Sequence, residues 1–221
     1  MPIVLAFDVY GTLIDTHGVA IKLREFVGGK AQEFSRVWRE KQLEYLFRRG
    51  LMRAYETFDV CTNQALDYAC TSLDAGLTTD QKEALMAEYR GLPAFDDVKE
   101  SLVGLKAYGY SLHAFSNGTA DAVETLLAAA GILDLFDGVV STDDRQTFKP
   151  NPDVYEHLLK TTTASAGDVW LISSNPFDVI GAVSYGLRSA WVQRSKNSIF
   201  DPWGIEPTHT ITSLHELEKV L

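Results

Sequence analysis

The sequence is poor in basic residues and in cysteine, and it has no long apolar run. Its 20 lysines and arginines are outnumbered by 30 aspartates and glutamates, which gives a formal net charge of −10. Such a charge disfavours binding to nucleic acid or to an anionic membrane surface. No apolar run reaches the length that crosses a bilayer, and the first residues lack the basic segment of a signal peptide. We therefore expect a cytoplasmic protein that binds neither nucleic acid nor membrane.

Several catalytic and metal-binding motifs are also missing. The two cysteines, Cys61 and Cys70, would lie on opposite faces of one predicted helix, so we expect no disulfide between them. No spacing of cysteine and histidine is typical of a zinc site. There is no Gly-x-Ser-x-Gly elbow, no phosphate-binding P-loop and no Gly-x-Gly-x-x-Gly after a strand. These absences disfavour serine hydrolases, P-loop nucleotidases and dinucleotide-binding enzymes.

The chain reads as one strand, a helical block and then an alternating region. The apolar residues 3–6 predict a buried strand. Helical periodicity extends from about residue 16 to about residue 92, and Thr78 offers an N-cap within it. The apolar residues expected on one face of the longest helix are Phe34, Val37, Trp38, Tyr45 and Met52. We interpret this block as a helical insertion after the first strand.

From residue 98 onward, predicted helices and strands alternate. The predicted strands are residues 111–115, 138–141, 169–173, 189–192 and 208–211. Strands separated by helices indicate a parallel sheet with right-handed crossovers. The predicted fold is therefore α/β, a Rossmann-like parallel-sheet core with an inserted helical cap subdomain. We place the discontinuous core at residues 1–14 and 96–221 and the insertion at residues 15–95.

Polar residues stand where the predicted strands end. Asp8 follows the first strand, Ser116 and Asn117 follow the second, and Lys149 lies in a later loop. The fourth segment, residues 173–178, follows another strand and ends in Asp178. Because parallel sheets bind ligands at the carboxyl ends of their strands, these segments are expected to converge. Taken singly, each residue could instead be a helix cap, a turn residue or a solvated charge.

The combination suits covalent catalysis by a carboxylate. Asp8 would be the nucleophile, although a capping aspartate at a strand end is the simpler alternative. Lys149 could keep Asp8 ionised, and Ser116 and Asn117 could donate hydrogen bonds to an anion. Arg39 belongs to a helix rich in basic residues, whose default is a solvated face. Leucines one and two turns further along that helix favour a pocket for an organic anion instead.

These segments resemble those of the haloacid dehalogenase superfamily, and the match spans nearly the whole chain. The matching motifs are Asp8-Val9-Tyr10-Gly11-Thr12, Ser116-Asn117-Gly118, Lys149-Pro150 and Ser173-Ser174-Asn175-Pro176-Phe177-Asp178. The helical block is similar to the cap that this superfamily inserts after its first strand. Most members are magnesium-dependent phosphatases, with a second aspartate where Tyr10 stands and an acidic metal ligand where Ser173 stands. Tyr10 and the cap stretch from Trp38 to Tyr45 resemble the L-2-haloacid dehalogenase branch instead.

The resemblance implies hydrolysis of short (S)-2-haloalkanoic acids to (R)-2-hydroxyalkanoic acids, with inversion at C2 and without metal or cofactor. Asp8 would displace the halide and form an ester, which water would then hydrolyse. Arg39 and Asn117 would receive the halide, and Ser116 would hold the substrate carboxylate. By the same resemblance, Asp8 would be positioned by Lys149 with Thr12, Ser173 and Tyr155. The water would be oriented or activated by Asn175 and Asp178. The apolar wall around the carbon chain would consist of Tyr10, Leu43, Phe58 and Phe177.

The resemblance further implies a homodimer that forms through the cap, with a 2-haloacid as substrate and halide as product. Glu40, next to Arg39, adds a negative charge that could face the pocket or pair with Arg39. Two alternatives stay open. One is a magnesium-dependent phosphatase of the same superfamily, and the other is a non-catalytic binding protein that keeps the fold.

Overall fold

A parallel sheet of six strands forms the centre of the protein, in the order β3-β2-β1-β4-β5-β6. The computed structural model describes residues 2–221. The prediction of an α/β fold with a Rossmann-like parallel sheet is confirmed. The strands are β1 (Val4–Phe7), β2 (Ser111–Ser116), β3 (Gly138–Ser141), β4 (Val169–Ser173), β5 (Arg188–Val192) and β6 (His209–Ile211).

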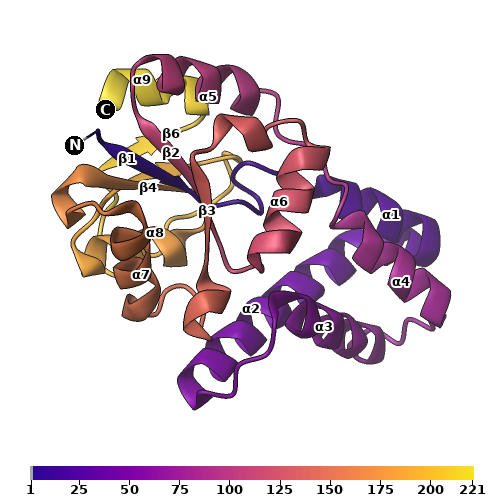
Figure 1. Ribbon diagram of the computed structural model, residues 1–221. Helices are drawn as coiled ribbons and strands as arrows, with labels where there is room; N and C mark the ends of the chain where they lie inside the picture. The colour runs from indigo at the N-terminus through magenta and orange to yellow at the C-terminus, as the bar shows by residue number, and fades with distance from the viewer. Residues whose placement is uncertain (1) are drawn as a thin grey trace.

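Helices cover both faces of this sheet (Figure 1). One face carries α5 (Val98–Ala107), α6 (Ala120–Ala129) and the short α9 (Leu217–Val220). The other carries α7 (Pro152–Thr162) and α8 (Pro176–Tyr185). Every strand that lies between two covered faces must be apolar on both, which explains the uninterrupted apolar runs in the sequence.

Strand β1 shows this two-sided burial most clearly. Leu5 and Phe7 belong to the core cluster that includes α5 and α6 residues, whereas Val4 and Ala6 belong to the cluster of α7 and α8. All four side chains are at most 3% exposed. Because β1 pairs with β2 on one side and β4 on the other, the residue that follows it is placed at the middle of the sheet edge.

The block between β1 and α5 consists of helices and lies beside the carboxyl edge of the sheet (Figure 1). Its helices are α1 (His17–Val27), α2 (Ala31–Met52), α3 (Phe58–Ser72) and α4 (Thr79–Glu88). Thr78 caps α4 as expected, in a reciprocal pair of hydrogen bonds with Gln81. Helix α2 packs on α3, and the Trp38 indole N–H donates to the carbonyl of Thr62 at 2.8 Å.

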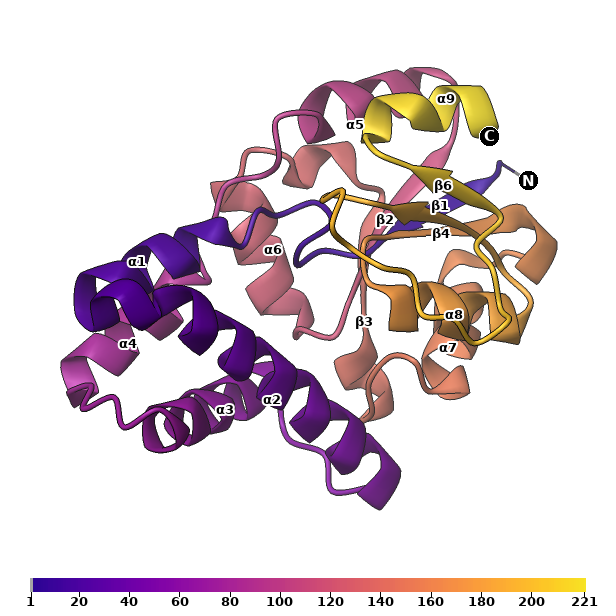
Figure 2. The ribbon, with the colours of Figure 1, turned by 180° about the vertical axis from the view of Figure 1, so that it is seen from behind.

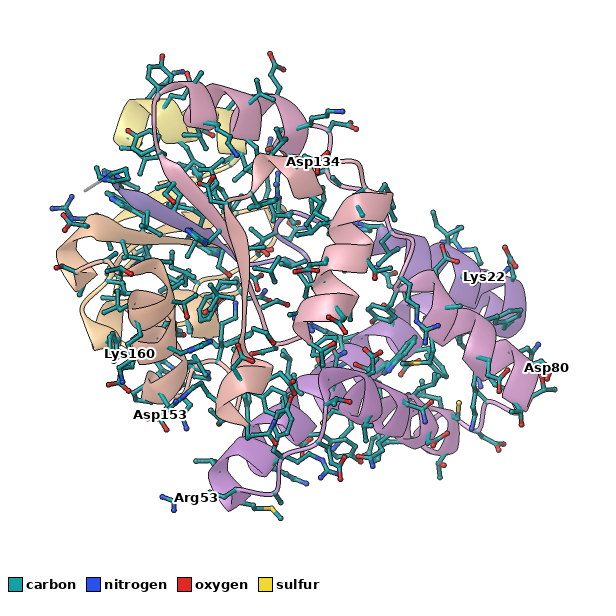
Figure 3. The ribbon with its side chains drawn as sticks, viewed as in Figure 1. Lys22, Arg53, Asp80, Asp134, Asp153 and Lys160 are labelled. Carbon is teal, nitrogen blue, oxygen red and sulfur yellow. The ribbon has the colours of Figure 1, made fainter. Side chains whose placement is uncertain are left out.

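The last turn of α2 departs from the predicted pattern. Phe34 and Trp38 are buried as expected, but Met52 is 70% exposed and Leu51 is 86% exposed. Met52 therefore continues the predicted apolar face of α2 into a part of the helix that is not buried. Helix α2 extends beyond the start of α3, so its tip has no neighbouring helix to cover it (Figure 3, near Arg53).

The helical block leaves and rejoins the sheet at one place. Ile14 and Ala94 form an isolated antiparallel bridge, the Asp15 amide donates to the Pro93 carbonyl at 2.8 Å, and the Phe95 amide donates to the Leu13 carbonyl at 3.0 Å. Figure 2 shows both crossing segments close together on the side of α1. These two chain segments, residues 13–15 and 93–95, therefore lie side by side and form a short paired neck between the block and the sheet.

Cys61 and Cys70 are unpaired, as expected, and both are buried. Within residues 2–221, no helix combines the length and apolar character that crossing a membrane requires.

Candidate active site

Asp8 lies at the sheet edge because the chain turns sharply just after β1. Its amide still donates to the Ile172 carbonyl of β4 at 2.9 Å, which extends the sheet by one residue. The amides of Leu13 and Ile14 then both return to the Val9 carbonyl at 3.0 Å. Gly11 adopts a φ of 83°, a conformation that favours glycine, so the turn can stay tight. Asp8 is only 7% exposed, and its carboxylate faces the convergent segments.

Three donors hold the Asp8 carboxylate. Oδ1 accepts from Lys149 Nζ at 2.9 Å. Oδ2 accepts from the Thr12 hydroxyl at 2.7 Å and from the Asn175 side-chain amide at 2.8 Å. A buried carboxylate is costly unless hydrogen-bond donors replace water, as these three do. The site therefore holds an oriented anionic oxygen pair at the sheet edge.

Lys149 lies between two carboxylates and is almost completely buried. Its ammonium donates to Asp8, to Asp178 Oδ2 at 2.7 Å and to the Phe115 carbonyl at 2.9 Å, so all three of its N–H groups are used. Burial alone would favour the neutral amine, but Asp178 and Asp8 outweigh it and raise the pKa of Lys149. The lysine is therefore a fixed cation that links Asp8 to Asp178.

Asp178 has no exposed surface. The Tyr155 hydroxyl lies 3.1 Å from Asp178 Oδ1, to which it donates. Burial first, and the nearby Asp8 charge second, raise the pKa of Asp178 to about 6, although Lys149 acts in the opposite direction. The close approach of Tyr155 to α8 requires Gly181, because a Cβ there would collide with the tyrosine hydroxyl. Asp178 is thus a carboxyl that can change protonation state near neutral pH.

Ser116, the last residue of β2, and Asn117, which follows it, have different surroundings. Asn117 accepts at its side-chain oxygen from the Lys149 amide at 2.9 Å and from Thr142 Oγ1 at 3.3 Å. Because both donors bind the side-chain oxygen, they fix the orientation of the amide and leave its NH2 group able to donate to another partner. Ser116 Oγ accepts from the Gly118 amide at 3.1 Å, and Ser173 Oγ likewise accepts from the Asn175 amide at 3.1 Å.

Arg39 reaches this edge from α2. Its Nη2 donates to Asn175 Oδ1 at 3.3 Å, and its Nη1 donates to Gln42 Oε1 at 2.6 Å. Burial lowers the pKa of Arg39, while Tyr89 and Asp8 favour its charged form. The expectation that Glu40 pairs with Arg39 or faces the pocket is wrong. Both Glu40 oxygens accept from Arg36 at 2.8 Å on the exposed surface of the helix.

Aromatic and aliphatic side chains line the site on the side of the helical block. The Tyr10 ring stacks on Phe58 with centroids 5.0 Å apart, and Leu43 packs in the same small cluster. Burial raises the pKa of Tyr10 far above its usual value, so its phenol stays neutral. Phe177 is placed differently, because its ring makes an edge-to-face contact with Phe47 of α2 at 5.3 Å.

Two residues that the sequence reasoning did not single out belong to these surroundings. Tyr89, at the end of α4, makes an edge-to-face contact with Tyr10 at 6.3 Å and is electrostatically coupled to Arg39. Nothing local in the sequence marks it, because its position depends on how α4 packs. Ser174 donates its amide to Thr12 Oγ1 at 2.8 Å and its hydroxyl to the Gly11 carbonyl at 2.9 Å. It lies within the motif that starts at Ser173 and could have been found there.

The donor set does not resemble that of a magnesium site. The two carboxylates at the edge, Asp8 and Asp178, both use an oxygen to accept from Lys149, so the cation position between them is filled by an ammonium. Among residues 2–221, no cluster of three or more histidine, cysteine, aspartate or glutamate side chains could hold a metal ion. Chemically, the arrangement offers an anionic nucleophile, a second carboxyl and several N–H donors for anions.

Comparisons of the sequence and of the fold with known proteins both lead to haloacid dehalogenases and their family. A family model described as haloacid dehalogenase-like hydrolase matches residues 4–186. The (S)-2-haloacid dehalogenase 2 of Pseudomonas sp. (strain CBS-3) is 35% identical over 98% of this chain and 94% of its own length. The (S)-2-haloacid dehalogenase of Pseudomonas sp. (strain YL) is 36% identical over 98% and 93%. The solved structure of L-2-haloacid dehalogenase from Xanthobacter autotrophicus with chloropropionic acid covalently bound is 29% identical, covers 100% of this chain and 98% of that one, and superposes with a TM-score of 0.90.

Proposed function

Since the chain belongs to the haloacid dehalogenase-like hydrolase family, we propose that it is an (S)-2-haloacid dehalogenase. It converts short (S)-2-haloalkanoic acids to (R)-2-hydroxyalkanoic acids through an ester on Asp8. The observation that supports this most strongly is the Asp8 carboxylate, held by Lys149, Thr12 and Asn175 at the edge of the sheet. The close relatives named (S)-2-haloacid dehalogenase support the substrate class.

In the first step, an oxygen of Asp8 attacks C2 of the substrate. A carbon–oxygen bond forms as the carbon–halogen bond breaks, the halide leaves with the bonding electrons, and C2 is inverted. Arg39 and the side-chain NH2 of Asn117 are the proposed donors for the halide. Ser116 is the proposed partner of the substrate carboxylate. A halide needs no proton to leave, so the lack of a carboxylic acid at Tyr10 is no obstacle.

In the second step, water attacks the carboxyl carbon of the Asp8 ester. Asp178 in its ionised form takes a proton from the water, and Asn175 orients the reacting group. The ester bond between the Asp8 carboxyl carbon and the substrate oxygen breaks, and the product oxygen takes the proton back from Asp178. Asp8 keeps one solvent oxygen and releases its remaining proton to solvent. Lys149, Thr12, Ser173 and Tyr155 hold Asp8 and Asp178 in place through both steps.

Four apolar or aromatic residues are proposed to enclose the carbon chain. Tyr10, Leu43 and Phe58 lie together in support of this role. Phe177 is proposed as the fourth and borders α2 through Phe47. A wall with few polar groups favours short alkyl chains and limits the water around C2 while Asp8 attacks.

The phosphatase alternative differs in its need for a metal. We expect halide release from (S)-2-chloropropanoate in the presence of a chelator, and no magnesium-stimulated release of phosphate from phosphate esters. Strict dependence on magnesium would refute the dehalogenase proposal.

The non-catalytic alternative is separated by isotope labelling. A single turnover in ¹⁸O-water should leave the product unlabelled and place one ¹⁸O on Asp8, as measured by mass spectrometry of the peptide that contains it. D8N should release no halide while its circular dichroism stays that of the wild type. Label in the first-turnover product would show direct attack by water and would contradict the ester.

We also propose that residues 15–95 act as a cap on residues 1–14 and 96–221, and that two copies associate through this cap. An apolar groove of about 780 Å³ supports the second proposal, since it runs between the tip of α2 and α8. Leu51 and Trp203, which line it, are 86% and 73% exposed. Light scattering should give twice the chain mass, and L51E should give a monomer. A wild-type monomer at micromolar concentration would rule this out.

A cytoplasmic location is proposed as well. The two unpaired cysteines suit a reducing compartment. Cell fractionation tests it directly, and recovery outside the cytoplasm would contradict it.

A further inference from the structure

A buried ion pair, Arg194–Asp97, lies against the Asp8 turn at the carbonyl of Thr12. Arg194, two residues after the end of β5, donates to both Asp97 oxygens from Nη1, at 2.9 and 2.7 Å. The side chains of Arg194 and Asp97 are only 14% and 12% exposed. A pair this buried is costly to form unless its remaining hydrogen-bonding groups are also used.

Those remaining groups converge on the turn itself. Arg194 donates to the Thr12 carbonyl from Nη2 at 2.7 Å and from Nε at 3.2 Å. Asp97 also accepts from the Ser213 hydroxyl at 2.9 Å and from the Leu214 amide at 2.8 Å. The guanidinium in addition lies over the Phe95 ring, 4.3 Å from its centre. One arginine thus ties the Thr12 carbonyl to both the neck and the C-terminal segment.

Thr12 is the residue through which this support reaches the reacting atoms. Its hydroxyl donates to Asp8 Oδ2, and its carbonyl is the one that Arg194 holds. Two N–H groups on one carbonyl fix the plane of the peptide bond, and thus the backbone position from which the Thr12 side chain reaches Asp8. Only the planar fork of arginine can bind a carbonyl and a carboxylate at once with this geometry.

We propose that Arg194 and Asp97 are positioning residues for the nucleophile, which act by fixing Thr12 and hence the direction of the Asp8 carboxylate. This inference rests on the proposed function. It adds that the neck, which Asp97 adjoins, is part of the machinery that aims Asp8. Neither residue touches the substrate, so binding should survive a change that slows the attack.

The test uses R194K, because lysine keeps a positive charge for Asp97 but lacks the fork that reaches the carbonyl. The matched control is R188K, at an exposed arginine of β5 that lies near the Trp170 ring. We expect R194K to lower kcat about 10- to 100-fold, the cost of a misplaced reacting group, with KM within threefold of wild type. R188K should change neither. Hydrogen exchange of a peptide that covers residues 9–15 should be faster in R194K and unchanged in R188K.

The outcomes separate cleanly. A kcat within twofold of wild type in R194K overturns the inference, as does exchange of residues 9–15 at the wild-type rate. A lower Tm with unchanged kcat per folded molecule would make the pair purely structural, which also overturns it. A wild type that releases no halide from any 2-haloacid refutes the proposed function instead, and the exchange measurement then decides alone whether Arg194 holds the turn.

Discussion

Helix α2 and the sheet edge at Asp8 both carry pairs of opposite charges, but the two sets differ in what surrounds them. On α2, Arg36 pairs with Glu40, and Lys41 and Arg48 both pair with Glu44, in contact with solvent. At the sheet edge, Lys149 is 1% exposed and has a carboxylate on either side. Figure 3 shows other charged residues of the helical block, Lys22, Asp80 and Arg53, projecting outward. Charges of the same kind therefore serve solubility in one place and chemistry in the other.

The largest difference between the two regions is expected when one lysine from each is replaced and stability and activity are measured. K149M leaves two buried carboxylates without a counter-charge, so we expect the free energy of unfolding to fall by about 3–5 kcal/mol. Activity should fall by about 10³-fold, because the anion is no longer held in place. K41M removes a half-buried charge of α2 that pairs with Glu44 at the helix surface, and it should change both quantities far less. Denaturant titration and halide release measure the two effects, and equal effects of the two variants would break the comparison.

The buried region should also respond to pH where the exposed one does not. Because the pKa of Asp178 is raised to about 6, this carboxyl should gain a proton below that pH and cease to accept one from water. Ester hydrolysis should slow below about pH 6, and D178N should be slower by about 100-fold and lose this dependence. Rapid-quench measurement of the ester on Asp8 between pH 5 and pH 8 would show it. A wild-type profile that stays flat through pH 6 would contradict the assignment.

Stability gives an independent measure of the same group. The pKa of Asp178 is higher in the folded protein than the ordinary 3.8, so the folded state binds the proton more tightly. Its contribution to the free energy of unfolding is fully present below about pH 4 and is lost as the pH rises through about 6. The free energy of unfolding of the wild type minus that of D178N should therefore decrease as the pH rises from about 4 to above 6.

Tyr10 lies between the two regions and should respond in an intermediate way. Its ring stacks on Phe58, so Y10A should lower kcat/KM about 10-fold by the loss of one packed ring, about 1.4 kcal/mol. Y10F keeps the ring and should stay close to wild type. Steady-state kinetics with 2-chloropropanoate distinguish them, and a loss as large in Y10F would show that the phenol rather than the ring matters.

The smallest effect is expected at Glu40, which is adjacent in sequence to Arg39 but pairs with Arg36 in solvent. E40Q should change kcat and KM by less than about twofold, as is usual for an exposed charge. The matched change R39K, at the residue that donates to Asn175, should change kcat and KM much more than E40Q does. A large effect of E40Q on KM would show that Glu40 acts at the sheet edge near Asp8 rather than on the exposed surface of α2.

The parts of the protein that depend on local pattern could be predicted from the sequence. Apolar runs gave the parallel strands, and the strand ends located Asp8, Lys149 and Asp178 near one another. Their distances and shared hydrogen bonds needed the structure, because they depend on side-chain packing across segments far apart in the chain. Arg194 and Tyr89 could not be found in this way for the same reason. The exposure of Met52 could not be predicted, because helical periodicity cannot say where a neighbouring helix stops.

The paired neck at Ile14 and Ala94 has a consequence for how the protein tolerates change. The ends of the helical block are so close that the core chain spans almost no distance between them, and loop-closure entropy rises only slowly with the length of an inserted segment. Helices in the block could therefore be lengthened, shortened or exchanged for another module with little effect on the sheet, provided the two strands of the neck are kept. The block is in this sense a replaceable attachment, and we predict that exchanging it changes the substrate preference while Asp8 and its hydrogen-bond partners stay unchanged.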